Sequence, residues 1–204
     1  MKIICIGRNY AEHAKELGNK VPDKPVIFLK PDSALIPKGH PFFYPTFTKD
    51  LHFEVEIVIR INKVGKNIEE RFAHKYYNEI GIGIDFTARD LQQKCKDNGH
   101  PWEIAKAFDF SAPLSKKFLP LSNFTSVQDI NFSLKKNGAI VQMDNTKNMV
   151  FSVDRIIKEV SEIFILKTGD LIFTGTPKGV GPVQIGDKLE AFIGEESLLE
   201  LNVR

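Results

Sequence analysis

The chain has 204 residues, of which 42% are hydrophobic and 26% charged, and its formal net charge at pH 7 is +2. This size and composition are typical of a globular protein, so we expect residues 1–204 to form one catalytic or binding domain. The nearly balanced charge gives no electrostatic basis for binding nucleic acid or a membrane surface, and no apolar run approaches the roughly 18 residues of a membrane-spanning helix.

The N-terminus and the cysteines favour a cytoplasmic protein. The apolar run near Met1 is too short for a signal peptide, and no small-residue cleavage site follows it. Cys5 and Cys95 are the only cysteines, and they form no Cys-x-x-Cys pattern. We therefore expect a reducing compartment, the cytoplasm, and no disulfide framework.

The first 25 residues are predicted to form a strand, a short helix and a loop. Residues 2–6 are an apolar run typical of a buried strand, and residues 11–17 have the pattern of a short helix with Asn9 as its N-cap. The polar, proline-containing residues 19–25 follow as a loop. We expect the helix and the loop together, at about residues 8–24, to form a mobile lid.

The predicted helix carries a candidate general base. His13 and Glu16 are three positions apart, so they share a helix face and can touch. A neighbouring carboxylate holds an imidazole in one tautomer and raises its basicity. The alternative is a solvated helix face on which the two residues meet by chance.

Two strand-like stretches bring acidic residues together. Residues 51–61 alternate with a period of two, which places Glu54 and Glu56 on one face, roughly 6.5–7 Å apart at about 3.3 Å per residue. Residues 79–85 alternate as well, with Asp85 on the face opposite the isoleucines. If the two strands lie near each other, the three carboxylates converge.

Converging carboxylates need a compensating charge, because like charges and burial both raise the pKa of a carboxyl group. A divalent cation removes this conflict. Carboxylate oxygens suit hard ions such as Mg²⁺, Mn²⁺ or Ca²⁺ better than Zn²⁺. The sequence thus predicts a metal site at Glu54, Glu56 and Asp85. The alternative is that Glu54 and Glu56 line the solvent-exposed face of a sheet.

Helices are predicted on both sides of the second strand, at residues 68–78 and 87–98, the latter opened by a capping box of Thr87 with Asp90. Arg89 and Gln92 lie in the first turns of this helix, close to the acidic end of the preceding strand. Because an arginine binds a carboxylate through two parallel hydrogen bonds, both residues are candidates for gripping a small acid. The alternative is a solvated helix surface.

Lys106 has apolar neighbours in the sequence, among them Ile104, Ala105 and Phe108. Such a lysine either extends its ammonium group to water or is placed for a function. Beside a metal site it would neutralise a substrate anion or a developing enolate.

The C-terminal half is predicted from strand, turn and cap patterns. Strands are expected at residues 114–118, 129–135, 171–173, 188–190 and 198–203, with a hairpin turn at Asn137-Gly138 and a helix from a Ser152 cap to about residue 164. The glycine-rich residues 174–181 lack the Walker spacing, and their N–H groups either meet an anion or form plain turns.

Taken together, these motifs resemble the fumarylacetoacetate hydrolase family, and most closely its compact acylpyruvase and oxaloacetate decarboxylase type. The segments that carry the resemblance are Gly7-Arg8-Asn9-Tyr10 with His13 and Glu16, Leu51-His52-x-Glu54-x-Glu56, Asp85-x-Thr87-Ala88-Arg89-Asp90-x-Gln92, Pro101-Trp102 with Lys106, and Thr174-Gly175-Thr176-Pro177-Lys178-Gly179-Val180-Gly181. They follow one another in order across nearly the whole chain.

The resemblance implies a fold, a cofactor and roles for named residues. The fold is a mixed α/β, β-rich domain, a mixed β-roll with short peripheral helices, usually assembled as a homodimer. Mg²⁺ or Mn²⁺, with Ca²⁺ as a further option, is held by Glu54, Glu56 and Asp85. The catalytic residues implied are His13 and Glu16, which activate a water from a lid helix, and Lys106; the substrate-lining residues implied are Arg8, Arg89, Gln92 and Thr176.

The implied activity is hydrolysis of the C–C bond in acylpyruvate-type 2,4-dioxo acids through a metal-stabilised enolate. The same site would decarboxylate oxaloacetate, with no attacking water. One alternative is isomerisation or decarboxylation of 2-hydroxyhepta-2,4-diene-1,7-dioate-like dienols, which needs a second cationic subsite that the sequence does not identify. An alternative of another class is a non-catalytic module that binds divalent cations.

Overall fold

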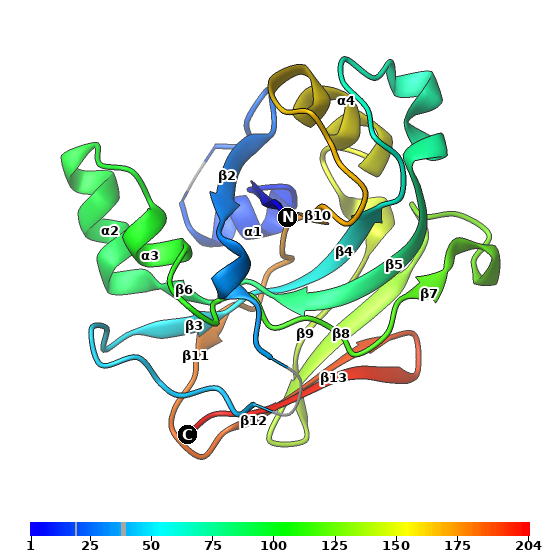
Figure 1. Ribbon diagram of the computed structural model, residues 1–204. Helices are drawn as coiled ribbons and strands as arrows, with labels where there is room; N and C mark the ends of the chain where they lie inside the picture. Colours follow the sequence, from blue (N-terminus) through cyan, green and yellow to red (C-terminus); the bar gives the residue numbers. More distant parts are fainter. Residues whose placement is uncertain (19, 38–39) are drawn as a thin grey trace.

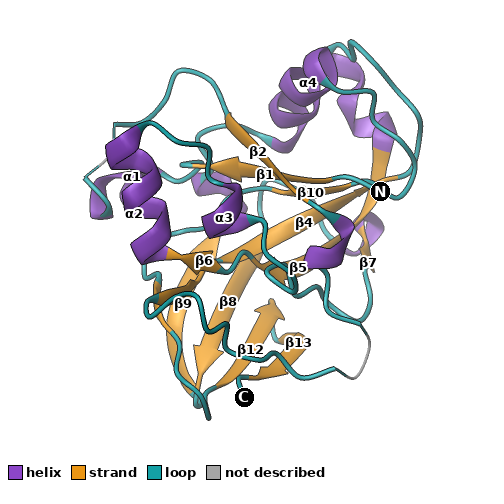
Figure 2. Ribbon diagram, turned by 60° about the vertical axis from the view of Figure 1, so that its left-hand side comes forward, coloured by secondary structure: helices purple, strands orange, loops and turns teal. Residues whose placement is uncertain are grey.

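The structure, a computed structural model, describes residues 1–18, 20–37 and 40–204. Its described strands form three sheets, and the four-stranded sheet lies below the six-stranded one in both views (Figures 1 and 2). The six-stranded sheet has the order β2 (Val26–Lys30), β1 (Ile3–Gly7), β10 (Leu171–Phe173), β4 (Val55–Ile61), β5 (Tyr77–Ile84) and β7 (Leu119–Pro120). The smaller sheets have the orders β11 (Gly181–Pro182), β3 (Leu51–Phe53), β6 (Thr87–Ala88), and β13 (Glu196–Asn202), β12 (Lys188–Ile193), β8 (Asn131–Lys136), β9 (Ala139–Asn145).

Short helices surround the sheets. They are α1 (Ala11–Glu16), α2 (Arg89–Asn98), α3 (Glu103–Lys106) and α4 (Val153–Ile163), with 3-10 turns at Asp32–Ala34, Glu70–Tyr76, Leu121–Asn123 and Thr146–Asn148. Figure 2 shows α1, α2 and α3 grouped on one side of the molecule and α4 on the other. Among the described helices, none combines the length and the apolar character needed to cross a membrane. The predicted mixed, β-rich α/β fold is confirmed.

The large sheet is covered on both faces, which decides the environment of the acidic residues. Ile57 and Ile59 of β4 pack into the main apolar core, while Val58, on the opposite face, packs into a smaller cluster with Phe173. Strands buried on both sides are near-continuously apolar rather than half solvated. Glu54 and Glu56 are only 5% and 2% exposed. The alternative that they line a solvent-exposed face is therefore wrong.

The glycines of β5 are explained by close packing. A Cβ atom on Gly83 would lie 2.5 Å from the Phe173 ring, and one on Gly81 would lie 2.7 Å from Ser115 Oγ. No side chain larger than hydrogen fits there without displacing a neighbour. These two glycines let β5 pass directly beneath the residues that cover it.

The expected single strand at residues 51–61 is wrong, because the chain changes sheets at Glu54. β3 pairs with β6 and β11, whereas β4 pairs with β5 and β10. The apolar alternation of the sequence continues across this break, so the periodicity gave no indication of the change of sheet. The break places Glu54 at a corner between two sheets.

Two other elements differ from expectation. The helix predicted at residues 68–78 is a 3-10 turn at Glu70–Tyr76, and β5 takes over from Tyr77. Residues 114–118, which are described, do not form the predicted strand, and the next strand is β7 at Leu119–Pro120. From Tyr77 onward, pairing with Ile61 of β4 outweighs the helical pattern, whereas Leu114 makes only an isolated bridge to Gly83.

The predicted hairpin turn and the predicted Ser152 cap are confirmed. Asn137 and Gly138 both adopt positive φ, 53° and 83°, in the turn between β8 and β9. Ser152 Oγ accepts a hydrogen bond from Arg155 N at 3.1 Å and caps α4. The predicted lid at residues 8–24 includes residue 19, which lies outside the described residues, and its mobility stays a prediction.

Candidate active site

Three buried carboxylates, which we call the carboxylate cluster, meet where β4 begins and β5 ends. Glu54 lies at the corner between β3 and β4, Glu56 lies in β4, and Asp85 follows β5 directly. Pairing of Glu56 with Gly83 and a 2.8 Å bond from Asp85 N to Glu54 O hold the two strand ends in register. One oxygen from each carboxylate lies within 4.8 Å of the other two. The structure thus brings together the three residues predicted as metal ligands.

Two cationic side chains compensate Glu54. Lys106 Nζ donates to Glu54 Oε2 at 2.8 Å and to Asp85 Oδ2 at 2.6 Å, and Arg89 Nη2 donates to Glu54 Oε1 at 2.5 Å. Burial alone would raise the pKa of Glu54, but Lys106 and Arg89 outweigh burial and hold that pKa well below its ordinary value. Burial likewise would lower the pKa of Lys106, but Asp85 and Glu54 outweigh it and raise that pKa. Glu54 is ionised and Lys106 is a cation.

Glu56 is less well compensated than Glu54. Its Oε2 accepts a 2.8 Å hydrogen bond from Gly175 N. Burial and the nearby Asp85 carboxylate nonetheless raise the pKa of Glu56 well above its ordinary value. A further positive charge beside Glu56 would favour its ionised form.

Lys30, which the sequence reasoning did not identify, supports the cluster from behind. Its Nζ lies 2.8 Å from Asp85 Oδ1, 3.3 Å from Phe86 O and 3.0 Å from Ser111 Oγ, and it also contacts Lys106 O. The only signal was a lysine at the end of an apolar strand. Lys30 thus links the Asp85 carboxylate to the backbone of Lys106, the last residue of α3.

The donor set fits a hard divalent cation. All three donors are carboxylate oxygens, the type that Mg²⁺, Mn²⁺ and Ca²⁺ prefer. Asp85 Oδ1 is fully buried and makes no hydrogen bond among the described residues, although Lys30 lies within ion-pair distance. Three buried carboxylates this close together repel one another, and a bound divalent cation would relieve that repulsion.

The predicted dyad forms on α1. His13 Nδ1 lies 3.1 Å from Glu16 Oε2, and His13 is 5% exposed. Glu16 is held in turn by Gly179 N, which donates to Glu16 Oε1 at 3.0 Å. The backbone at residues 174–181 thus orients the carboxylate, and the carboxylate orients the imidazole.

Asn9 has a different role from the one predicted, since Tyr10 is the N-cap of α1 and makes no side-chain cap bond. The Asn9 side chain accepts from Phe151 N at 2.7 Å and donates to Thr174 O at 2.7 Å. The capping box at α2 is also wrong. Ala88 is the N-cap, and Thr87 Oγ1 donates to Asp85 O at 3.3 Å. Both polar side chains position the strand ends of the site instead of capping helices.

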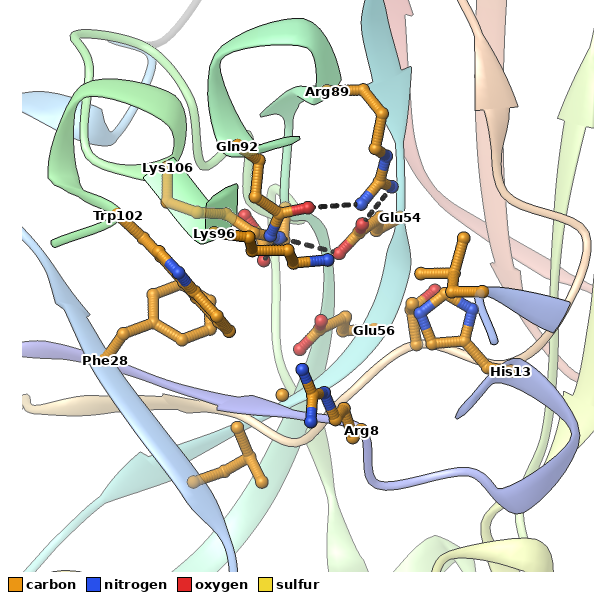
Figure 3. Close-up of a pocket in the computed structure, with 15 residues that line it drawn as sticks. Arg8, His13, Phe28, Glu54, Glu56, Arg89, Gln92, Lys96, Trp102 and Lys106 are labelled. Carbon is orange, nitrogen blue, oxygen red and sulfur yellow. Dashed lines mark hydrogen bonds and ion pairs between the residues drawn. The ribbon is translucent and has the colours of Figure 1, made fainter. Parts of the chain in front are cut away.

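A cavity of about 40 Å³ opens onto the carboxylate cluster. Figure 3 shows Arg89 and Gln92 approaching from one side, and His13 and Arg8 from others. Arg89 Nη1 donates to Gln92 Oε1 at 2.8 Å. The lining includes every predicted substrate residue, namely Arg8, Arg89, Gln92 and Thr176, together with Phe28, Lys96 and Trp102, which were not predicted. The narrowness of the cavity favours a small ligand.

Gln142 in β9 is a second residue that the sequence did not reveal. It is 1% exposed, its Oε1 accepts from Val55 N at 2.9 Å, and its Nε2 donates to Thr176 Oγ1 and Pro177 O, each at 2.9 Å. After Phe173 the chain diverges from β4, and this side-chain amide bridges the gap. An isolated glutamine in a hairpin strand gives no signal of such a role.

Comparisons with known proteins place this geometry in a family. The family model described as fumarylacetoacetate (FAA) hydrolase C-terminal matches residues 2–204. The chain is 44% identical over 191 residues to the Mus musculus protein named oxaloacetate tautomerase FAHD1, mitochondrial, which covers 94% of this chain and 86% of that protein.

Solved structures agree with the family model. The fumarylpyruvate hydrolase of Pseudomonas aeruginosa, in complex with Mn²⁺ and pyruvate, superposes with a TM-score of 0.93 at 36% identity, over 100% of this chain and 89% of that chain. The 2-hydroxyhepta-2,4-diene-1,7-dioate isomerase of Mycobacterium marinum superposes with a TM-score of 0.85 at 32% identity, over 99% and 73%. The resemblance seen in the motifs is confirmed: the chain belongs to the fumarylacetoacetate hydrolase family and, like these named relatives, is an enzyme.

Proposed function

We propose that the protein is a divalent-metal-dependent enzyme that acts on a small 2-oxo acid through its enolate, with keto–enol tautomerisation of oxaloacetate as its main reaction. The observation that carries this proposal is the buried carboxylate cluster with Lys106 bonded to two of its members, at the base of a 40 Å³ cavity. The relationship to an oxaloacetate tautomerase supports the choice of substrate.

The carboxylate cluster would hold Mg²⁺ or Mn²⁺, and Ca²⁺ is a less suitable ion for catalysis. The bound ion would polarise the ketone of the substrate and lower the energy of the enolate. Lys106 supplies a second positive charge beside the same oxygen, already ordered by Glu54 and Asp85. Arg89 and Gln92, bonded to each other, offer N–H groups to the 1-carboxylate. Thr176 contributes a hydroxyl from the opposite wall.

His13 is the group that moves the proton. When Nδ1 donates to Glu16, Nε2 is unprotonated and free to accept. In the enol-to-keto direction, the C2 hydroxyl would release its proton to solvent and protonated His13 would deliver a proton to C3. In the reverse direction, neutral His13 would take the proton from C3, and protonation of the C2 oxygen from solvent would give the enol. Glu16 stabilises the imidazolium formed in between.

Hydrolysis of an acylpyruvate is the second candidate, because the same dyad can activate a water. His13 would take a proton from the water, whose oxygen attacks the distal carbonyl. Cleavage of the C3–C4 bond then leaves a carboxylic acid and the pyruvate enolate, which is protonated at C3. Decarboxylation of oxaloacetate needs the enolate stabilisation but no attacking water. The alternative of a non-catalytic cation-binding module is set aside, because the named relatives are enzymes.

One parallel assay separates these reactions. Mg²⁺-loaded enzyme is supplied with the enol form of oxaloacetate, with keto-oxaloacetate and with acylpyruvates, and loss of enol absorbance, CO₂ release and acid release are recorded. We expect His13→Ala to impair tautomerisation and hydrolysis while decarboxylation persists. Equal loss of all three reactions would exclude proton transfer by His13. Full turnover after metal removal would exclude the proposal itself.

The homodimer implied by the resemblance and the cytoplasmic location remain predictions. Light scattering of the purified protein tests the first, and fractionation of cells that express it tests the second.

A further inference from the structure

Two cationic side chains enter the cavity without an anionic partner. Arg8 comes from the turn between β1 and α1, and Lys96 comes from the second half of α2 (Figure 3). Within the described part of the chain, neither side chain forms an ion pair or a hydrogen bond with a carboxylate, whereas Arg89 and Lys106 both do. Partly buried cations are normally paired, so these two point to an anion that the protein does not itself supply.

The backbone at Arg8 is held in an unfavourable conformation. Its φ is +60°, in the left-handed region that residues other than glycine rarely adopt. The next residue, Asn9, is fixed by its bonds to Phe151 and Thr174, so the turn is imposed by its surroundings. Residues kept in such conformations cluster at ligand sites, where the direction of the side chain matters.

Lys96 lies among other cations. Burial lowers the pKa of Lys96, and the charges of Arg89 and Arg8 lower it further, outweighing the attraction of Glu54. Its Nζ also lies 5.9 Å from the centre of the Trp102 ring, within reach of a weak cation–π contact. A lysine on the exposed side of α2 would avoid this repulsion. Lys96 instead lines the cavity.

The balance of charge in the cavity indicates how much negative charge the ligand carries. The lining holds four cations, Arg8, Arg89, Lys96 and Lys106, against the three carboxylates of the cluster. A divalent metal would raise the excess of positive charge to three. A 2-oxo acid with one carboxylate would leave two charges uncompensated, whereas a diacid would leave one.

We propose that Arg8 and Lys96 form a binding site for the second carboxylate of a dicarboxylic 2-oxo acid, so that the enzyme selects diacids over monoacids of the same length. This inference rests on the proposed function, because the first carboxylate and the ketone occupy the carboxylate cluster, Arg89 and Gln92. It supplies the cationic subsite that neither the alternation of strands nor the helix patterns identified.

The kinetic test compares oxaloacetate with its 4-methyl ester, which lacks the distal charge and is larger by one methyl group. Lys96→Met should raise the KM for oxaloacetate about tenfold to a hundredfold, the loss of a charge-assisted hydrogen bond, while the KM for the ester changes less than about threefold. Lys96→Arg should restore the preference for the diacid. Lys94→Met, on the exposed side of the same helix, is the matched control and should change neither KM.

A binding test keeps the outcome independent of turnover. With Mg²⁺ present, calorimetry compares malate with 2-hydroxybutyrate, two unreactive four-carbon acids that differ only in the distal carboxylate. Wild-type protein should prefer malate at least tenfold, and Arg8→Gln or Lys96→Met should abolish most of that preference. Failure to prefer malate, equal weakening of both acids, or the same effect from Lys94→Met would overturn the inference. An inactive wild type that still prefers malate would refute the proposed reaction and leave the carboxylate site standing.

Discussion

Replacing Gln142 by methionine tests how the two halves of the site are held together. The side chain in β9 links Val55, between two residues of the carboxylate cluster, to Thr176 and Pro177 on the opposite wall. Methionine has nearly the same length and volume but offers no comparable donor or acceptor. The substitution therefore removes the three hydrogen bonds and leaves the packing almost unchanged.

The expected loss follows from those contacts. A buried hydrogen bond contributes about 0.5–1.5 kcal/mol net, so three of them amount to roughly 3 kcal/mol. The Val55 N–H donates to Gln142 Oε1, so the substitution leaves a buried donor unpaired, which places the estimate toward the upper end. We also expect Thr176 to move away from the cavity, with a rise in KM of about tenfold at 1.4 kcal/mol per factor of ten.

Urea unfolding at pH 7, steady-state kinetics and hydrogen exchange of residues 174–181 measure the three consequences. Gln93→Met is the matched control, because Gln93 is exposed and makes one bond, to Asp97 at 2.7 Å. We expect the control to change stability by less than about 0.5 kcal/mol. A Gln142→Met protein with wild-type stability and unchanged exchange at residues 174–181 would refute the bridging role.

Three further predictions follow from the site and the core. Mg²⁺ at about 100 times its Kd should stabilise the protein by roughly 2.7 kcal/mol, and Glu56→Gln should abolish both that shift in thermal melting and turnover; an unchanged shift would remove Glu56 from the metal site. Burial would raise the pKa of Asp170, but Lys2 and backbone N–H groups outweigh burial and lower that pKa. The ionised Asp170 carboxylate therefore stabilises the fold at pH values above the ordinary carboxyl pKa, and this stabilisation is lost as the pH falls through the lowered pKa of the folded protein. Asp170→Asn should therefore destabilise the protein at pH 7 by about 2 kcal/mol and much less near pH 2, as measured by urea unfolding; equal losses at both pH values would contradict this. Gly83→Ala should cost about 1–3 kcal/mol because its Cβ would lie 2.5 Å from the Phe173 ring, and Phe173→Leu in the same chain should recover part of the loss; simple addition of the two losses would argue against the clash.

Much of the candidate site was visible in the sequence because its residues lie in short motifs. His13 and Glu16 are three positions apart, so their contact follows from the helix period. Glu54 and Glu56 are two positions apart, and they remain close although the chain changes sheets at Glu54. The approach of Asp85 was a conditional expectation, which required pairing of β4 with β5. Lys30 and Gln142 are joined to the site only by contacts across 34 or more residues, and no periodicity reports such contacts.

The sequence by itself determined the features that depend on neighbours along the chain: the turn at Asn137-Gly138, the Ser152 cap, the strand at Leu171–Phe173 and the short helix with its His–Glu pair. Only the tertiary structure decided where the chain changes sheets at Glu54 and why Asn9 bonds distant backbone instead of capping a helix. The physical reason is that a local pattern sets which conformations a segment prefers by a few tenths of a kcal/mol per residue, whereas buried polar groups must find partners wherever the fold offers them, at one to several kcal/mol each.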